Sequence, residues 1–281
     1  MQRHPHFALW LHEDAQLSAL LGAEIVGRTT LHEWPLSCVQ RLRLAGGATR
    51  IYKVQAQPTV EPAFYARACS PLLVAAQLVE HDEGPPALLL EEVQSPRLAD
   101  LKLPAAEALN IGRAALAQIA VISGDLPALA DLRTAALWLA YWQTVLDDLS
   151  QLAATGVFVR VDQALARDLA RQAAAADVLA AFESTIGYVH GDLSAGNLFV
   201  AQSGLRVIDW QRPLWGPTAL DLVCLLDSLG VDPRAFLDEG VVRLFYLLRI
   251  AWLTQCARRW FPAGAATYDS AIVRLAARLV A

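Results

Sequence analysis

The chain has 281 residues, of which 55% are apolar and 18% are charged, and its formal net charge at pH 7 is -5. Enough apolar residues are present to bury a large core, which excludes disorder as the main state of the chain. The negative net charge argues against a protein that binds the phosphate backbone of nucleic acids, because such proteins gather Lys and Arg on one surface. We therefore expect a folded protein that has no nucleic acid partner.

The cysteines and the apolar runs indicate the compartment. Widely spaced cysteines that form neither a CxxC pair nor a zinc-type spacing with histidine predict small buried residues in a reducing environment. The four are Cys38, Cys69, Cys224 and Cys256. The apolar segment at residues 7–11 is too short for the core of a signal peptide, and no later run approaches the ~18 residues of a membrane helix. We expect a soluble cytoplasmic protein without membrane contact, and the sequence leaves its oligomeric state open.

The first third of the chain is rich in strand signals. Short segments with β-branched and apolar residues alternate with Gly- and Pro-containing turns, which predicts antiparallel strands. The expected elements are a β-hairpin of residues 38–44 and 49–55 around a turn at 45–48, a short helix over 61–68, and strands over 74–80 and 87–92 joined by a turn at 81–86.

The pattern changes to that of helices after residue 103, where apolar residues recur at intervals of three and four. The expected helices span 104–122, 132–153 and 162–182, and helices resume at Thr218 and continue to the C-terminus. Between them, short apolar runs over 186–205 predict a small β insertion. The result is an α+β fold in which a small strand-rich lobe precedes a large helical lobe, and ligands commonly bind between two such lobes.

The most informative segment is Tyr188–Val200, which contains the pattern H-G-D-x-x-x-x-N. It places Asp192 and Asn197 five residues apart in a loop between two apolar strands. Twelve residues later, Asp209 ends another apolar strand. Phosphoryl transfer needs one carboxylate to orient or deprotonate a hydroxyl, and oxygen ligands that hold magnesium on the nucleotide. Gly, Asp, Ser and Asn are also common in ordinary turns, but the spacing and the strand context favour the catalytic interpretation.

This pattern, followed by I-D-W at residues 208–210, resembles the catalytic and metal motifs of the aminoglycoside phosphotransferase and choline kinase-like family, relatives of the eukaryotic protein kinases. The resemblance covers most of the chain and implies a two-lobed protein kinase-like fold. Residues 1–93 would form a nucleotide-binding lobe with the hinge at its end, and residues 94–281 a helical lobe with the catalytic loop, the metal site and the acceptor pocket. The implied reaction transfers the γ-phosphate of ATP or GTP, with Mg²⁺, to a hydroxyl of a small metabolite or aminoglycoside-like acceptor.

The resemblance also implies roles for individual residues. Asp192 would be the catalytic base or orient the hydroxyl, and Asn197 and Asp209 would be the magnesium ligands. His190 would support the loop, and Asp221 would buttress it from the start of a helix. An acid at a helix start is also favoured by the helix dipole alone, so both interpretations of Asp221 remain open.

Lys53 is one of only two lysines among the 23 basic residues. Alternation along the predicted strand places Ile51, Lys53 and Gln55 on one face. The position of Lys53 corresponds to the third strand of the kinase small lobe, whose lysine contacts the nucleotide phosphates. A solvent-facing lysine on an edge strand is the alternative, but the downstream motifs favour the phosphate role. Glu61, at the start of the predicted helix, is the expected partner of Lys53, although the helix dipole alone would also favour an acid there.

The segment Leu88–Val93 resembles the hinge between the lobes, where the backbone of Glu91 and Val93 would hydrogen-bond adenine. The phosphates would be covered by the turn at residues 33–38, through its backbone amides and Ser37, because no G-x-G-x-x-G loop is present. The A-P-E motif of protein kinases is also missing after the I-D-W motif. A protein kinase is therefore a weaker interpretation than a small-molecule kinase, and a non-catalytic nucleotide-binding module is the other alternative.

Aromatic and acidic side chains of the helical lobe are candidates for the acceptor pocket, where aromatic rings beside carboxylates would hold an ammonium group. The candidates are Trp215, Tyr246, Trp252, Trp260, Asp227 and Asp232. Trp and Tyr at helical spacing belong more often to a hydrophobic core than to a ligand cage. An amino-bearing acceptor is one hypothesis, and core packing of these aromatic residues is the other.

Overall fold

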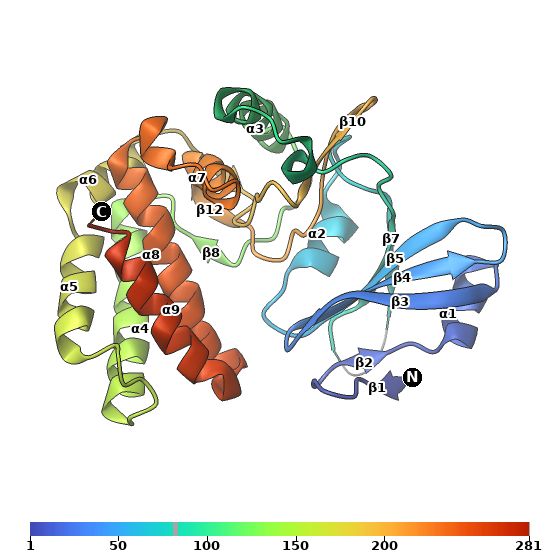
Figure 1. Cartoon of the computed structure of the whole chain (residues 1–281), viewed down its shortest axis with the longest axis horizontal. Helices are drawn as coiled ribbons and strands as arrows, with labels where there is room; N and C mark the ends of the chain where they lie inside the picture. Colours follow the sequence, from blue (N-terminus) through green and yellow to red (C-terminus); the bar gives the residue numbers. More distant parts are fainter. Residues whose placement is uncertain (81–83, 281) are drawn as a thin grey trace.

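The computed structural model describes residues 1–80 and 84–280 of the chain. A strand-rich lobe from the N-terminal third lies beside a mainly helical lobe formed by the remainder, as Figure 1 shows. The expected α+β arrangement is therefore confirmed. The turn expected over 81–86 includes residues 81–83, which lie outside the described residues.

The strand-rich lobe contains an antiparallel sheet of five strands in the order β3-β4-β5-β7-β6. Its strands are β3 (Ile25–Trp34), β4 (Ser37–Leu44), β5 (Thr49–Gln55), β6 (Ala76–Val79) and β7 (Ala87–Glu91). The predicted hairpin is formed by β4 and β5, and its register pairs Val39 with Lys53. Because Lys53 also pairs with Leu88 of β7, β5 is an inner strand and not the edge strand of the alternative interpretation.

Short elements complete this lobe: β1 (Gln2–Arg3), β2 (Trp10–Leu11), α1 (Asp14–Leu21) and α2 (Glu61–Arg67). Helix α2 begins where the sequence predicts, with Pro62 in its first turn. Proline suits this position because its φ is already helical and its missing N–H needs no partner there. Glu61 and Phe64 of α2 are both fully buried, so the helix brings a carboxylate and an aromatic ring to the boundary between the lobes.

The helical lobe contains the longer helices, and α4, α5, α8 and α9 gather on its side away from the sheet (Figure 1). The α-helices are α3 (Ala105–Ile119), α4 (Ala135–Ala154), α5 (Gln163–Ala173), α6 (Ala176–Ala180), α7 (Ala219–Ser228), α8 (Glu239–Gln255) and α9 (Ala265–Ala277). Shorter helical segments are η1 (Leu98–Leu101), η2 (Ala181–Glu183), η3 (Pro233–Ala235), the π-helix η4 (Cys256–Trp260) and η5 (Pro262–Gly264). Trp138 and Trp142 of α4 lie in the centre of the core.

The β insertion expected over 186–205 is present as short strands that pair in two small sheets. They are β8 (Ala130–Asp131), β9 (Ile186–Val189), β10 (Leu198–Ala201), β11 (Gly204–Val207) and β12 (Leu214–Pro217). Strand β9 lies against β12, and β10 forms a hairpin with β11. Since β9 and β11 end at Val189 and Val207, the segments that follow them carry the H-G-D and I-D-W motifs.

Two expectations about the helical part and the cysteines are wrong in detail. The single helix expected over 162–182 is divided, because Ala175, which lies between α5 and α6, has an extended backbone. The Ala-rich sequence contains no stop signal there, and packing of α6 on α8 accompanies the break. Cys69 is exposed, and its backbone groups form an isolated bridge to Ser123. The other three cysteines are buried.

An aromatic stack joins the two lobes. The rings of Phe64 from α2 and Trp210 stack with centroids 4.4 Å apart. Tyr188 of β9 stacks on both at longer distances, and the His190 ring lies 4.4 Å from that of Trp210. These buried rings fix the segment after β11 against α2, which holds the two motif-bearing loops together. No helix in the described part of the chain is both long and apolar enough to cross a membrane.

The close approach of α8 to α6 yields a stability prediction. A Cβ added at Gly240 would lie 2.0 Å from the backbone oxygen of Asp177, so Gly240→Ala must push the helices apart. We expect the free energy of unfolding to fall by about 1–3 kcal/mol in urea denaturation, as for other overpacked sites. Gly46→Ala is the matched control, because nothing lies within 4 Å of the added carbon. Equal stability of the two variants would contradict this packing.

Candidate active site

One lysine ammonium joins three elements between the lobes. Lys53 Nζ, from β5, lies 2.5 Å from Glu61 Oε2 of α2 and 2.7 Å from Oδ1 of Asp209, which follows β11. The side chains of Lys53 and Glu61 are 6% and 0% exposed, whereas that of Asp209 is 32% exposed. A buried charge is costly unless it is paired, so this contact fixes the two lobes in one arrangement. The pairing of Lys53 with Glu61 expected from the sequence is observed as an ion pair.

The charges of this cluster respond to burial and to one another. Burial alone would lower the pKa of Lys53, but the carboxylates of Asp209 and Glu61 outweigh it and raise that pKa. Burial would raise the pKa of Asp209, but the ammonium of Lys53 outweighs burial and lowers it. For Glu61, burial dominates over the attraction of Lys53 and raises the pKa. Asp209, the more exposed of the two acids, therefore stays ionised to a lower pH than Glu61.

Glu61 also fixes the backbone beside Asp209. Its Oε1 accepts the backbone N–H of Trp210 at 3.0 Å, and its Oε2 accepts a hydrogen bond from the Gln55 side chain. Asp209 itself has φ of 72°, a left-handed conformation that is costly for a residue other than glycine. The surrounding contacts hold this conformation in place, and strained backbone of this kind is concentrated at functional sites.

The loop after β9 is ordered by His190. Its Nδ1 accepts the backbone N–H of Asp192 at 3.2 Å, so its Nε2 carries the hydrogen and donates to the Ile208 carbonyl oxygen at 3.0 Å. Burial lowers the pKa of His190, which favours this neutral tautomer. The ring therefore links the loop with Asp192 to the segment with Asp209, the supporting position expected from the sequence.

Asp221 anchors the same loop from α7. Its Oδ2 accepts the backbone N–H of His190 at 2.8 Å, and its Oδ1 accepts that of Gly191 at 3.0 Å. Burial raises the pKa of Asp221 to about 7, although these two N–H groups oppose the shift. An acid that only complemented the helix dipole would not need hydrogen bonds to this loop, so the interpretation of Asp221 as a support of the loop is the better one.

The loop also requires glycine at position 191. Gly191 has φ of 79°, and an added Cβ would lie 2.2 Å from the Arg212 carbonyl oxygen.

The carboxylate of Asp192 is held unequally at its two oxygens. Oδ2 accepts from Arg212 Nη2 at 2.5 Å, whereas Oδ1 has only longer contacts, to Arg249 Nη1 at 3.7 Å and Cys224 Sγ at 4.0 Å. The Asn197 side chain donates its Nδ2 to the Asp192 backbone oxygen at 2.9 Å. That bond uses the nitrogen of the amide and leaves its oxygen as the atom suited to a metal. Neither arginine was among the residues singled out from the sequence.

The remaining predicted nucleotide residues lie in the strand-rich lobe. The Glu91 backbone N–H, at the end of β7, donates to the Ala75 carbonyl oxygen at 2.9 Å, so a contact with adenine has to use the Glu91 carbonyl. Val93 follows β7 and packs against the apolar cluster around Leu88. Ser37 is buried and its hydroxyl accepts the Trp34 indole N–H at 2.6 Å. The phosphate contact expected of Ser37 stays a prediction.

Tyr65 is a residue that the sequence analysis missed. Its hydroxyl is buried and has no hydrogen-bond partner among the described residues. Burial, together with the nearby carboxylates of Glu61 and Asp209, raises the pKa of Tyr65 well above its ordinary value. The hydroxyl is therefore neutral, and its oxygen is enclosed by the protein.

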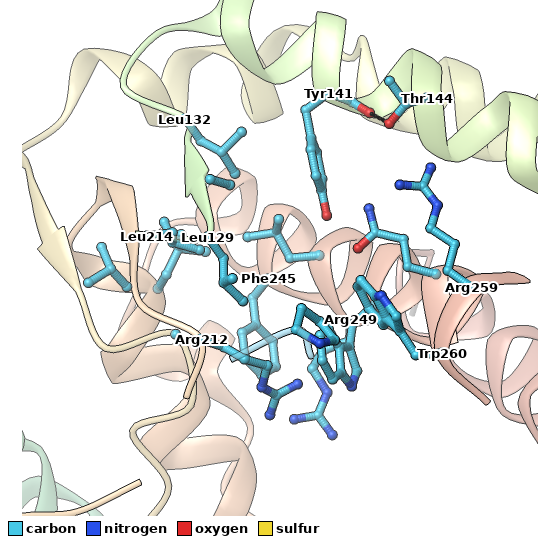
Figure 2. A pocket seen from close by; sticks show the side chains of 18 residues that line it. Leu129, Leu132, Tyr141, Thr144, Arg212, Leu214, Phe245, Arg249, Arg259 and Trp260 are labelled. Carbon is cyan, nitrogen blue, oxygen red and sulfur yellow. Dashed lines mark hydrogen bonds between the residues drawn. The ribbon is translucent and has the colours of Figure 1, made fainter. Parts of the chain in front are cut away.

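A cavity of about 340 Å³ lies beside the loop that contains Asp192, and Gly191 of this loop is part of its lining. Figure 2 shows Arg212 and Arg249 together at one end of it, with Arg259 and Trp260 farther along and the Tyr141 hydroxyl directed inward. Most of the other lining side chains are apolar. The lining residues are Pro58, Leu129, Ala130, Leu132, Tyr141, Thr144, Val189, Gly191, Arg212, Leu214, Leu220, Phe245, Leu248, Arg249, Trp252, Gln255, Arg259 and Trp260.

Only two of the predicted acceptor residues, Trp252 and Trp260, line this cavity, and their rings lie 4.9 Å apart. The other four candidates do not line this cavity. Tyr246 is fully buried and donates its hydroxyl to Asp227 at 2.8 Å, while Asp227 also pairs with Arg278. The side chain of Asp232 caps η3, and Trp215 packs its ring against that of Tyr188. The charged lining residues are arginines, not acids.

A second group of metal-ligand types lies in the strand-rich lobe, where ligand atoms of His4, Glu33 and Cys38 are within 4.8 Å of one another. His4 Nδ1 accepts backbone N–H groups of His6 and Phe7, so its Nε2 carries the hydrogen and donates to Glu33 at 3.2 Å. Burial raises the pKa of Cys38 to about 11, which keeps the thiol protonated. The hydrogen bonds account for this group without a metal.

The family profile described as the phosphotransferase enzyme family matches residues 59–258, well over half of the chain. The chain belongs to this family. This membership agrees with the resemblance to phosphotransferases found in the sequence. Among curated proteins, the thiamine kinase of Shigella boydii serotype 4 (strain Sb227) is 35% identical over 74 residues, which are 26% of this chain and 26% of that kinase. The chain thus aligns with about a quarter of that relative's length.

Solved structures of phosphotransferases resemble the whole chain. A choline/ethanolamine kinase family protein from Mesorhizobium loti matches with a TM-score of 0.59 and 15% identity over 94% of this chain and 92% of that one. A macrolide 2'-phosphotransferase from Brachybacterium faecium gives 0.58 and 15% over 92% and 95%. A spectinomycin phosphotransferase, in complex with ADP and spectinomycin, gives 0.55 and 12% over 95% and 98%. At these identities the similarity establishes the kinase-like fold.

The contacts of Asp221 with the loop after β9 predict a pH-dependent effect of Asp221→Asn. The substitution replaces one carboxylate oxygen with an NH₂ group, which cannot accept the backbone N–H that faces it. We therefore expect the free energy of unfolding to fall by about 1–3 kcal/mol at pH 5. Because the folded pKa of about 7 exceeds the ordinary value of 3.8, the wild-type carboxyl contributes stability below about pH 4 and loses it as pH rises through 7.

The difference in stability between wild type and Asp221→Asn should therefore be larger at pH 5 than at pH 8 in urea denaturation. Asp168→Asn, which changes an exposed acid of α5, is the control and should have a small effect at both values. A difference that grows with pH would contradict the assigned shift.

Proposed function

We propose that this phosphotransferase transfers the γ-phosphate of ATP to a hydroxyl of a small molecule that binds in the cavity beside Asp192. One observation carries the proposal: Lys53 contacts Asp209, and Arg212, three residues later in the chain, both contacts Asp192 and lines the cavity. In this proposal residues 1–93 form the nucleotide lobe and residues 94–281 the acceptor lobe. GTP is an alternative donor, and the cytoplasm, which supplies both nucleotides, is the proposed compartment.

Lys53 is the proposed phosphate contact, and its charge and position support this role. Glu61 holds the Lys53 ammonium from one side. A phosphate oxygen bound near Asp209 would contact the same ammonium from the other side. Adenine would lie along the end of β7, where the Glu91 carbonyl oxygen and the Val93 backbone would form its hydrogen bonds. Ser37 and the backbone amides of the turn at residues 33–38 would cover the nucleotide phosphates.

The residues present fit a magnesium ion. The amide oxygen of Asn197 and the carboxylate of Asp209 are hard oxygen ligands of the kind that Mg²⁺ prefers, and this ion keeps several waters. Asn197 and Asp209 would hold the ion, and a bound Mg²⁺ would offset the negative charge of the nucleotide phosphates.

Asp192 is the proposed base. Arg212 occupies its Oδ2, so Oδ1 is the atom better placed to receive a proton. The acceptor oxygen would form a bond to the γ-phosphorus while the bond between that phosphorus and the leaving oxygen of ADP breaks. The hydroxyl proton would pass to Asp192, and His190 and Asp221 would hold the loop during the step.

A small acceptor is favoured over a protein substrate by the chain after Asp209. Strand β12 begins at Leu214 and α7 at Ala219, so little chain is available for an activation loop or a peptide platform. The cavity is also of the size of a small-molecule site. A non-catalytic module is the remaining alternative, and loss of transfer on substitution of Asp192 distinguishes it.

Asp192→Asn should abolish transfer while nucleotide binding persists. Losing a general base typically costs about 100-fold to 10,000-fold in rate, and the substitution leaves Lys53 and the metal ligands unchanged. The measurement is transfer of labelled γ-phosphate from Mg·ATP and Mg·GTP to pooled amino sugars, amino alcohols, sugars, nucleosides and hydroxy acids. Asp125→Asn, at an 89% exposed side chain, is the control and should match wild type. Turnover near that of wild type in Asp192→Asn would refute the role.

Asp209→Ala should remove the effect of magnesium on nucleotide binding. In wild type, titration calorimetry should give tighter ATP binding with Mg²⁺ than with EDTA, and we expect the variant to lose about 10-fold or more in the presence of Mg²⁺. Asp168→Ala, at an exposed acid, is the control. Unchanged affinity of Asp209→Ala in both buffers would exclude this residue from a metal site.

A further inference from the structure

The charge of the cavity points to a property of its ligand. Among its lining residues the ionisable side chains that carry charge at neutral pH are Arg212, Arg249 and Arg259, and none is an acid. This distribution is opposite to the one expected for an ammonium-bearing acceptor. An apolar pocket with a few charged groups usually uses those groups to orient its ligand.

Two of the three guanidinium groups are already balanced by carboxylates. Arg212 donates to Asp192 at 2.5 Å, and its guanidinium lies 4.3 Å from the centre of the Trp252 ring. Arg259 donates to the buried Asp148 at 2.6 Å. Burial alone would lower the pKa of Arg212, but Asp192 outweighs burial and raises it. Both arginines thus have close partners in the protein itself.

Arg249 is different. Its only ion-pair contact in the described structure is the 3.7 Å approach to Asp192, whose other oxygen is already held by Arg212. The side chain is 45% exposed and extends from α8 at the end of the cavity shared with Arg212, as Figure 2 shows. The cavity therefore carries one positive charge without a close counter-charge, at the end beside the catalytic loop.

The remaining walls indicate the body of the ligand. Trp252 and Trp260 form a pair of adjacent rings, and Leu214, Leu220 and Phe245 add apolar surface. Such walls suit a planar or aliphatic body, because aromatic side chains bury large apolar areas with specific ring geometry. A carboxylate matches a guanidinium in planar, two-point hydrogen bonding.

We propose that the acceptor is a hydroxy acid: an apolar or aromatic body with one carboxylate, which Arg249 binds, and a hydroxyl directed to Asp192. A monoanion fits the single unbalanced charge of the cavity. The proposal rests on the proposed function in taking this cavity as the acceptor site, and it names the substrate class of that site. Arg249 acts as the specificity residue for the carboxylate.

Three probes that share one body and differ in charge test this proposal. They are para-hydroxymethylbenzoate, para-hydroxymethylbenzamide and para-hydroxymethylbenzylamine, which are anionic, neutral and cationic at neutral pH. Dissociation constants are measured on the full chain by ligand-observed NMR without nucleotide. We expect the benzoate to bind about tenfold more tightly than the amide, since a charge-assisted bidentate contact is stronger than a neutral one. The benzylamine should bind most weakly.

Arg249→Gln removes the charge and keeps a hydrogen-bonding side chain, so it should bring the benzoate and the amide to within about twofold. Arg113→Gln, at an exposed arginine of α3 that does not line the cavity, is the matched control and should keep the preference. Equal binding of the probes, tighter binding of the amine, no binding of any probe, or a preference that survives in Arg249→Gln would each overturn the proposal.

Nucleotide binding is measured separately on the same samples. If the benzoate preference is present and depends on Arg249 while ATP does not bind, the proposed function fails and the charge selectivity of the cavity stands. If ATP binds and the benzoate shows no preference, the hydroxy acid proposal alone fails.

Discussion

The shared ammonium of Lys53 is the contact on which the site depends. It pairs with Glu61 from α2 and with Asp209 after β11, so one cation connects the sheet, the first buried helix and the helical lobe. Breaking such a buried pair leaves an uncompensated charge, which typically costs about 3–5 kcal/mol. Glu61 also accepts the backbone N–H of Trp210. The Glu61 carboxylate therefore helps to hold the left-handed backbone of Asp209, the residue before Trp210.

The loop with Asp192 is fixed by a second network that uses neutral and backbone groups. His190 connects it to the carbonyl of Ile208, and Asp221 accepts two of its N–H groups. Trp210 connects the two networks, because its ring stacks on Phe64 and contacts His190 while its backbone N–H donates to Glu61. Satisfied buried networks of this kind become rigid, and rigidity before the ligand arrives is what electrostatic catalysis requires. The site is thus preorganised by residues that need not touch a substrate.

Much of this arrangement was predictable from the sequence because its signals are local. The hairpin follows from turn chemistry, α2 from Pro62 after an acid, and the two motif loops from their spacing. The break between α5 and α6 was not predictable, because it depends on packing against α8. Arg212 and Arg249 were missed for a different reason: 21 of the 23 basic residues are arginines, so no single arginine stands out. A signal did exist in the helical spacing of Phe245, Arg249 and Trp252, which all line the cavity.

Under the proposed function, the arginines would also connect acceptor binding to the proposed base, Asp192. Arg212 and Arg249 both line the cavity and both approach Asp192, so any ligand that engages Arg249 changes the charge felt at Oδ1. A carboxylate that draws this guanidinium away would weaken its attraction for Oδ1 and make that oxygen a better proton acceptor. An ammonium would compete with the arginine for the same carboxylate and weaken the base. Under the proposed function, the charge that selects the acceptor would therefore also prepare the proton transfer to Asp192.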